Sequence, residues 1–129
     1  MADPTFLLDA NICIYLMEGV SSEARERVEA CRPGEVATSA IAYAEVMRKV
    51  PTGDPVKVAQ AEAIFRVVTV LPFDIAAARA YALMPFKRGT FDRLLIAAHA
   101  MALDLTFITN NERDFMDVAG LKMANWTRS

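Results

Sequence analysis

The sequence predicts an α/β fold, a mostly parallel sheet of four to five short strands with helices on both faces. Short apolar and β-branched runs alternate with longer segments whose apolar residues recur at helical spacing. The order is strand, two helices, strand, two helices, strand, two helices, strand, which is typical of parallel strands joined by helical crossovers. A chain of 129 residues has the length of one compact domain, so we expect residues 1–129 to form a single domain.

Each element is bounded by capping residues or by helix breakers. We expect strands at residues 5–8, 36–38, 67–70, 105–109 and 121–124. We expect helices at residues 10–18, 21–31, 39–50, 56–65, 74–85 and 91–103. The boundaries rest on N-caps, glycines, prolines and turns: Gly19, Ser21 or Ser22, Pro33-Gly34, Ser39, the loop 51–55, Asp74, the turn Lys87-Arg88-Gly89, and Thr90.

The overall composition excludes several classes of protein. Fourteen basic and sixteen acidic residues give a formal net charge of −2, so nucleic acid would have to bind at a local patch. Cys13 and Cys31 are the only cysteines, and with one histidine they do not make a zinc site. The first residues lack the basic and long apolar regions of a signal peptide, and no apolar run approaches the ~20 residues of a membrane span. We therefore expect a soluble cytoplasmic protein.

Acidic residues gather where the predicted strands end. Asp9 ends the first strand, Asp92 lies in the first turn of an apolar helix, and Asp114 follows the fourth strand closely. Glu45 lies on the helix after the second strand, among apolar neighbours. Ligand sites of open α/β sheets form at this carboxyl edge, so we expect the four acids to lie near one another.

Each acid also has a purely structural explanation. Asp9 is placed to cap the helix that follows it, Asp92 to complement a helix N-terminus, and Asn111 with Asp114 to form a capping box. A joint role explains the whole pattern better, because gathered carboxylates repel one another unless a cation lies among them. Oxygen ligands without cysteine or histidine suit Mg²⁺ or Mn²⁺.

Four segments cover essentially the whole chain: FLLDANICIYL (6–16), SAIAYAEV (39–46), FDRLLIAAHAMAL (91–103), and FITNNERDF (107–115) with GLKMANW (120–126). Together, in this order and spacing, they resemble the PIN-domain family, and most closely the VapC-type toxins of bacterial toxin–antitoxin pairs.

The resemblance implies a PIN-like three-layer fold and a Mg²⁺-dependent endoribonuclease. It also implies a homodimer held inactive by a small VapB-type antitoxin. The family's first three acids fall on Asp9, Glu45 and Asp92, whereas Asn111 stands where many relatives have an aspartate. We therefore expect Asp114 to serve as the fourth acid.

The expected chemistry is hydrolysis of an RNA phosphodiester bond by a metal-activated water. Asp9 and Asp92 would bind the metal directly, with Glu45 and Asp114 holding waters or a second ion. The candidate substrate-binding residues are Asn11, Arg93, Thr109 and Asn111.

Two other functions remain open on the residues alone. One is a phosphatase with Asp9 as its nucleophile, although such enzymes generally want a second aspartate where this chain has Asn11. The other is a catalytically silent binding module whose acids are structural. His99 lies among alanines and is expected to be a packed, hydrogen-bonded side chain, and Asp74 is expected to be an N-cap.

The chain is rich in apolar residues, which make up 54% of it, and this suggests a self-association face. Two helices carry more apolar residues than one core-facing stripe requires. The residues concerned are Ile41, Tyr43, Val46, Met47, Val50, Ile64 and Phe65.

Overall fold

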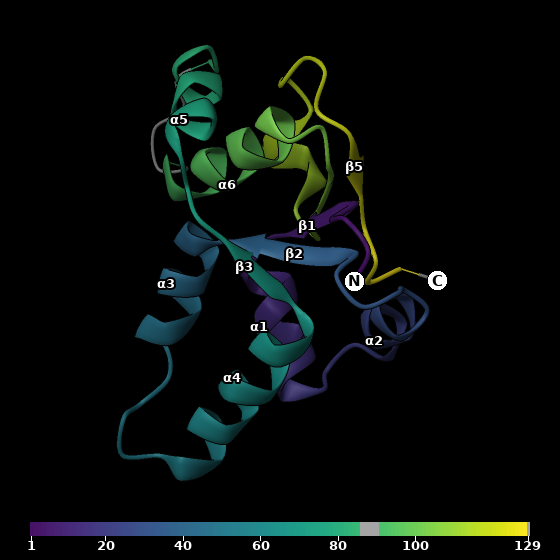
Figure 1. Cartoon of the computed structure of the whole chain (residues 1–129), viewed down its shortest axis with the longest axis vertical. Helices are drawn as coiled ribbons and strands as arrows, with labels where there is room; N and C mark the ends of the chain where they lie inside the picture. The colour runs from purple at the N-terminus through teal and green to yellow at the C-terminus, as the bar shows by residue number, and fades with distance from the viewer. Residues whose placement is uncertain (86–90, 129) are drawn as a thin grey trace.

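The protein is a three-layer α/β structure with one five-stranded sheet (Figure 1). The computed structural model describes residues 1–85 and 91–128, without the side chains of Phe91 and Asp92. The strand order is β3-β2-β1-β4-β5, and every pairing is parallel. The strands are β1 (Phe6–Leu8), β2 (Val36–Ser39), β3 (Thr69–Leu71), β4 (Thr106–Ile108) and β5 (Met123–Ala124).

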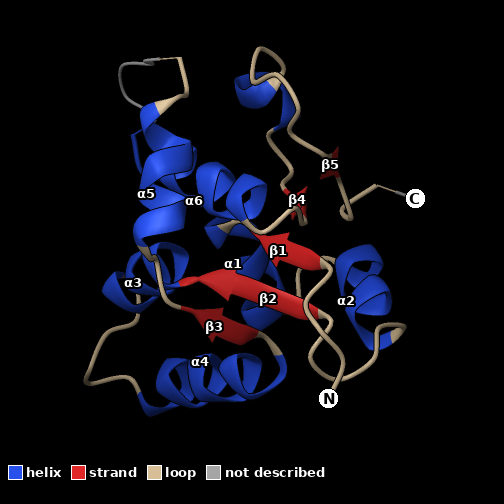
Figure 2. Ribbon diagram, turned by 45° about the horizontal axis from the view of Figure 1, so that its top comes forward, coloured by secondary structure: helices blue, strands red, loops and turns tan. Residues whose placement is uncertain are grey.

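Helices cover both faces of this sheet, as Figures 1 and 2 show. One face carries α1 (Ala10–Glu18), α2 (Ser22–Glu29), α3 (Ala40–Arg48) and α4 (Pro55–Val67). The other carries α5 (Ile75–Ala82) and α6 (Phe91–Ala102), and the 3₁₀ helix η1 (Glu112–Phe115) follows β4. The fold class and the parallel sheet that the sequence predicts are thus confirmed.

The central strands are buried because helices pack on both of their faces. All four residues of β2 are buried, and Leu7 and Leu8 of β1 have no exposed surface. Strands buried on both faces need apolar or small residues throughout, which is why these segments lack the alternation of a half-exposed strand. Polar Thr38 is accommodated in β2 because its hydroxyl donates to the carbonyl oxygen of Leu8 at 2.8 Å.

The predicted helix boundaries agree with the structure at most caps. Gly19 ends α1 with a φ of 67°, a left-handed conformation that glycine adopts at little cost. Ser21, Ser39 and Asp74 are the N-caps of α2, α3 and α5, each accepting a hydrogen bond from a backbone N–H of the first turn. The turn predicted at residues 87–89 and the cap predicted at Thr90 lie outside the described residues.

The third strand begins later than the sequence predicts. We expected it at residues 67–70, but Val67 still belongs to α4 and β3 begins at Thr69. Val68 is fully buried, and its N–H donates to the carbonyl oxygen of Ile64 at 2.8 Å. The β-branched run therefore starts as the last turn of a helix, because tertiary packing overrides a local preference for strand.

Most of the apolar residues that suggested a self-association face are covered within the chain. Val46 and Val50 are buried, and Ile41, Ile64 and Phe65 pack against the core. Tyr43 is 38% exposed and stacks edge-on with Phe65. Several of these residues thus contribute to the core, and the self-association face that they suggest stays a prediction. Among the helices that the structure describes, none is long and apolar enough to cross a membrane.

Candidate active site

The candidate site lies where the chain reverses its direction across the sheet. From the central strand β1, the chain first builds outward to β2 and β3, then crosses back to add β4 and β5 on the other side. The region beyond the carboxyl ends of β1 and β4 is therefore the switch point, the place at which such sheets bind ligands. Asp9 directly follows β1 and Thr109 directly follows β4, and both are buried.

Asp9 is a buried carboxylate held by hydrogen bonds on both of its oxygens. Only 2% of its surface is exposed. Oδ1 accepts from the backbone N–H of Ala10 at 2.8 Å, and Oδ2 accepts from the hydroxyl of Thr109 at 2.9 Å. Asp9 therefore caps α1 and lies at the carboxyl edge, and donors from the start of α1 and from the residue after β4 fix its orientation.

A chain of hydrogen bonds continues from Thr109 toward η1. The Thr109 hydroxyl oxygen accepts from the backbone N–H of Asn111 at 3.1 Å. The Asn111 amide donates through Nδ2 to Oδ2 of Asp114 at 2.6 Å, and Arg93 Nη1 donates to the same oxygen at 2.7 Å. The structure thus joins Asp9, Asp114 and three of the predicted substrate-binding residues in one network.

The capping box that offered an alternative explanation for Asn111 and Asp114 is not formed. Asn111 precedes η1, but its side chain makes no capping hydrogen bond to that helix. Its amide instead binds the Asp114 carboxylate. The turn after β4 therefore uses these two residues to hold a side chain of α6.

Glu45 lies on the middle of α3, whose start is fixed from two sides. The Ser39 hydroxyl oxygen accepts from the backbone N–H of Ile41 at 3.1 Å and lies 2.9 Å from Nδ1 of His99 on α6. Glu45 is partly buried, with its Oε1 atom shielded from solvent. The Ser39–His99 contact thus connects the helix that carries Glu45 with the helix that carries Asp92.

His99 is 1% exposed and packs edge-on against Phe73 with ring centroids 5.4 Å apart, as expected for a packed histidine. Burial lowers its pKa, because a charged imidazole is poorly solvated there, and the Asp74 carboxylate opposes this in part.

Asp92 is the second residue of α6, and its side chain lies outside the described part of the structure. Its neighbour Arg93 reaches Asp114, which places the first turn of α6 beside the turn that follows β4. The backbone therefore brings Asp92 to the edge of the sheet that carries Asp9.

Comparisons with known proteins agree with this architecture. The family model described as PIN domain matches residues 6–121. A Shigella flexneri protein named tRNA(fMet)-specific endonuclease VapC is 31% identical and aligns over 95% of this chain and 98% of its own length. The chain belongs to the PIN-domain family. Within that family it is a VapC-type nuclease, so it is a hydrolase.

Solved structures of VapC-type complexes have the same fold. DNA-bound VapBC from Salmonella typhimurium superposes with a TM-score of 0.84 at 24% identity, over 95% of this chain and 98% of that one. VapBC-1 from nontypeable Haemophilus influenzae gives 0.79 at 26% identity, over 96% and 99%. The predicted resemblance to this family is therefore confirmed over almost the whole chain.

The described donor atoms suit the divalent metal ions on which PIN-domain nucleases generally depend. Carboxylate oxygens are hard ligands, and Asp9 places one such group, oriented by two hydrogen bonds, at the carboxyl edge of the sheet. Within residues 1–85 and 93–128, no three Asp, Glu, His or Cys side chains lie close enough to form a metal site. Asp92 is a predicted metal ligand whose side chain lies outside the described residues.

Some features of the site were not evident from the sequence. The pairing of Arg93 with Asp114 spans 21 residues, and no short motif reveals a contact of that range. Asn110 donates to the Tyr15 hydroxyl at 3.0 Å and so ties the turn after β4 to α1. Asn11, a predicted substrate-binding residue, is half-buried on the first turn of α1.

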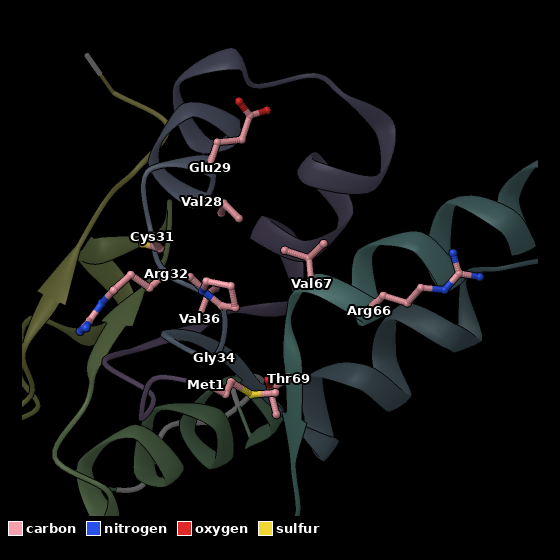
Figure 3. Close-up of a pocket in the computed structure, with 11 residues that line it drawn as sticks. Met1, Val28, Glu29, Cys31, Arg32, Gly34, Val36, Arg66, Val67 and Thr69 are labelled. Carbon is pink, nitrogen blue, oxygen red and sulfur yellow. The ribbon is translucent and has the colours of Figure 1, made fainter.

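A pocket of about 400 Å³ lies at the opposite edge of the sheet (Figure 3). Val36 and Thr69, the first residues of β2 and β3, line it together with Val28 of α2. Two arginines line it as well, but Figure 3 shows their side chains pointing away from each other. This pocket is separate from the acids, which follow the carboxyl ends of the strands.

Proposed function

We propose that this VapC-type nuclease cleaves RNA phosphodiester bonds with Mg²⁺ at the carboxyl edge of β1 and β4. The observation that carries the proposal is the buried Asp9 carboxylate at the switch point of the sheet, oriented by Ala10 and Thr109. Carboxylate oxygens are the ligands that Mg²⁺ prefers in proteins, and ligand sites of open α/β sheets form at this edge.

Asp9 and Asp92 would hold the Mg²⁺ ion, which supplies a Lewis acid and an activated water when it is bound. Asp9 contributes a rigid ligand, because hydrogen bonds from two elements fix the plane of its carboxylate. Glu45 and Asp114 orient water at the edges of the site. Thr109 and Asn111 position the acids, and Arg93 binds a phosphate of the RNA.

The substrate class that we propose is tRNA, and the place of action is the cytoplasm. The support is the relative from Shigella flexneri, which is named for its action on tRNA(fMet) and aligns end to end with this chain. The target of this protein depends on the shape of the surface around the acids, since single-stranded RNA loops are recognised by shape and stacking. Asn11, on the first turn of α1, is proposed to contact that loop.

The test is incubation of the purified protein with total RNA, with Mg²⁺ or with excess EDTA, followed by mapping of the cut sites. We expect discrete cleavage in tRNA with Mg²⁺ and none with EDTA. The variant Asp9→Asn should be inactive and still folded. Asp104→Asn is the matched control, because this carboxylate is 90% exposed and pairs with Lys122. Cleavage that persists in EDTA would contradict the proposed metal dependence.

Two alternative functions give different results in the same experiment. A phosphatase with Asp9 as its nucleophile would leave a covalent phosphate on that residue, which mass spectrometry detects. A silent binding module would bind RNA without cutting it under any metal condition. Either result would contradict the proposed nuclease activity.

We further propose that the protein forms a homodimer and is inhibited by a small antitoxin of the VapB type. The similar structures from Salmonella typhimurium and Haemophilus influenzae are VapBC complexes. Support for a dimer comes from exposed apolar residues on the α5–α6 side, where Leu83 is 89% exposed and lines a groove of about 600 Å³. A monomer in light scattering would contradict the dimer. Harmless expression of the active protein alone would contradict the need for an antitoxin.

A further inference from the structure

We propose that Asp114 occupies, in the RNA-free protein, the position of an RNA phosphate on Arg93, so that RNA binding exchanges one anion for the other. This inference rests on the proposed nuclease function and adds a regulatory step to it. Asp114 leaves Arg93 only when a phosphate has bound there, and it is then available to orient water at the site.

The contacts of Arg93 and Asp114 support this exchange. Nη1 of Arg93 lies 2.7 Å from Oδ2 of Asp114, and the amide of Asn111 donates to the same oxygen at 2.6 Å. Both side chains of the ion pair are 35% exposed. The guanidinium is thus reached by solvent while it is engaged by a carboxylate, and its fork of N–H donors can bind a phosphate in the same way.

The position of the pair favours a phosphate of the substrate over an unrelated anion. Arg93 is the immediate neighbour of Asp92 on α6. Asp114 is connected to Asp9 through Asn111 and the Thr109 hydroxyl. A phosphate that reaches the proposed metal ligands therefore arrives beside the arginine.

Three of the four other arginine pairs that the described residues form are local, whereas Arg128–Glu112 joins the C-terminal segment to η1. Arg25–Glu29 and Arg66–Glu62 are contacts between residues four apart on one helix, and Arg32–Glu35 are three apart. Arg93 and Asp114 lie 21 residues apart and join α6 to η1. A partly exposed ion pair of this kind is weak and screened by salt, so a polyanion can displace the carboxylate.

The exchange is tested by RNA binding in EDTA, where the proposed cleavage does not interfere. The probe is a fluorescein-labelled single-stranded oligoribonucleotide, and its Kd is measured by anisotropy over a range of salt concentrations. Asp114→Asn should tighten binding about two- to fivefold, because RNA then no longer has to break an exposed ion pair, whose strength corresponds to about that factor in Kd. Arg93→Ala should weaken binding and lower the slope of log K against log salt by about 0.7, the loss of one phosphate contact.

The decisive measurement is the double variant. Removing a carboxylate favours RNA binding through general electrostatics, so tightening by Asp114→Asn alone is not sufficient. In the Arg93→Ala background, Asp114→Asn should change the Kd by less than the single variant does. Arg93→Lys, which keeps a charge but loses the fork geometry, should retain part of the coupling. Equal tightening in both backgrounds would overturn the exchange.

Arg25 and Glu29 provide the matched control, because they form another arginine–carboxylate pair with a short contact of 2.8 Å on the remote helix α2. Arg25→Ala and Glu29→Gln should show no coupling in RNA binding. Absence of RNA binding by the wild-type protein would also overturn the inference. Coupling without Mg²⁺-dependent cleavage would leave the exchange standing and contradict the proposed nuclease function, so the two failures are distinguishable.

Discussion

The hydrogen bond between Thr109 and Asp9 makes a quantitative prediction about stability. Thr109→Val removes the hydroxyl and keeps the side-chain shape, so Oδ2 of Asp9 loses the donor at 2.9 Å. Thr109 is fully buried and Asp9 is 2% exposed, so water cannot easily replace that donor. A hydrogen bond to a charged group contributes about 1.5–3 kcal/mol. The half-buried N–H of Asn111 also loses its acceptor, and we expect a total loss of about 2–4 kcal/mol.

Thr38→Val is the matched control for this substitution. Thr38 is also fully buried, and its hydroxyl donates at 2.8 Å to a neutral acceptor, the carbonyl oxygen of Leu8. The new methyl group is buried in both variants, so its contribution largely cancels in the comparison. A hydrogen bond to a neutral group contributes about 0.5–1.5 kcal/mol. Thr38→Val should therefore lose less free energy of unfolding than Thr109→Val does, by about 1 kcal/mol at least.

The assay is urea unfolding at neutral pH with EDTA, followed by the fluorescence of the single tryptophan. Trp126 is 3% exposed and packs edge-on against Phe6 of β1, so its emission should change when the sheet unfolds. Domains of this kind have about 5–15 kcal/mol of stability, so both variants should remain folded without urea. If Thr109→Val loses no more stability than Thr38→Val, the hydroxyl does not support an ionised Asp9 and the role assigned to it is wrong.

Three further predictions concern residues outside the acid network. Asp74→Ala should lower the free energy of unfolding by about 0.5–2 kcal/mol in urea, because Asp74 accepts from the N–H of Ala77 at 3.0 Å, and nuclease activity should be kept. Burial lowers the pKa of His99, so the unfolded chain binds a proton at this residue more readily than the folded protein does. The contribution of His99 to the free energy of unfolding should therefore be complete above about pH 6.5 and decrease as the pH falls below that value. His99→Gln should flatten that dependence of the melting temperature between pH 8 and 5, and an unchanged slope would contradict it. Burial raises the pKa of the Cys13 thiol to about 12, so mass spectrometry should find Cys13 unalkylated by iodoacetamide at pH 8 in the native protein and alkylated in urea.

Local chemistry accounts for the parts of the fold that the sequence predicts well. Asp74 is recognisable as an N-cap because the short side chain precedes a run of alanines, and the structure shows the capping bond. Gly19 is recognisable as a helix end for a similarly local reason. Such boundaries depend on a few consecutive residues, so no long-range contact needs to be known. The boundary at Val67 was missed because burial of Val68, which involves distant elements, decided it.

Some features of the candidate site also follow from local sequence, whereas others depend on the tertiary structure. The sequence by itself determined which acids follow strands and helix starts, since residue type, order and spacing are written along the chain; Asp9, Glu45, Asp92 and Asp114 remain proposed site residues on that basis. Only the tertiary structure decided that β1 and β4 are neighbours, so that Thr109 meets Asp9 at a separation of 100 residues. It also decided that Arg93 is held by Asp114. The physical reason is that hydrogen bonds and ion pairs depend on distances of about 3 Å, and strand order sets those distances between residues that share no local pattern.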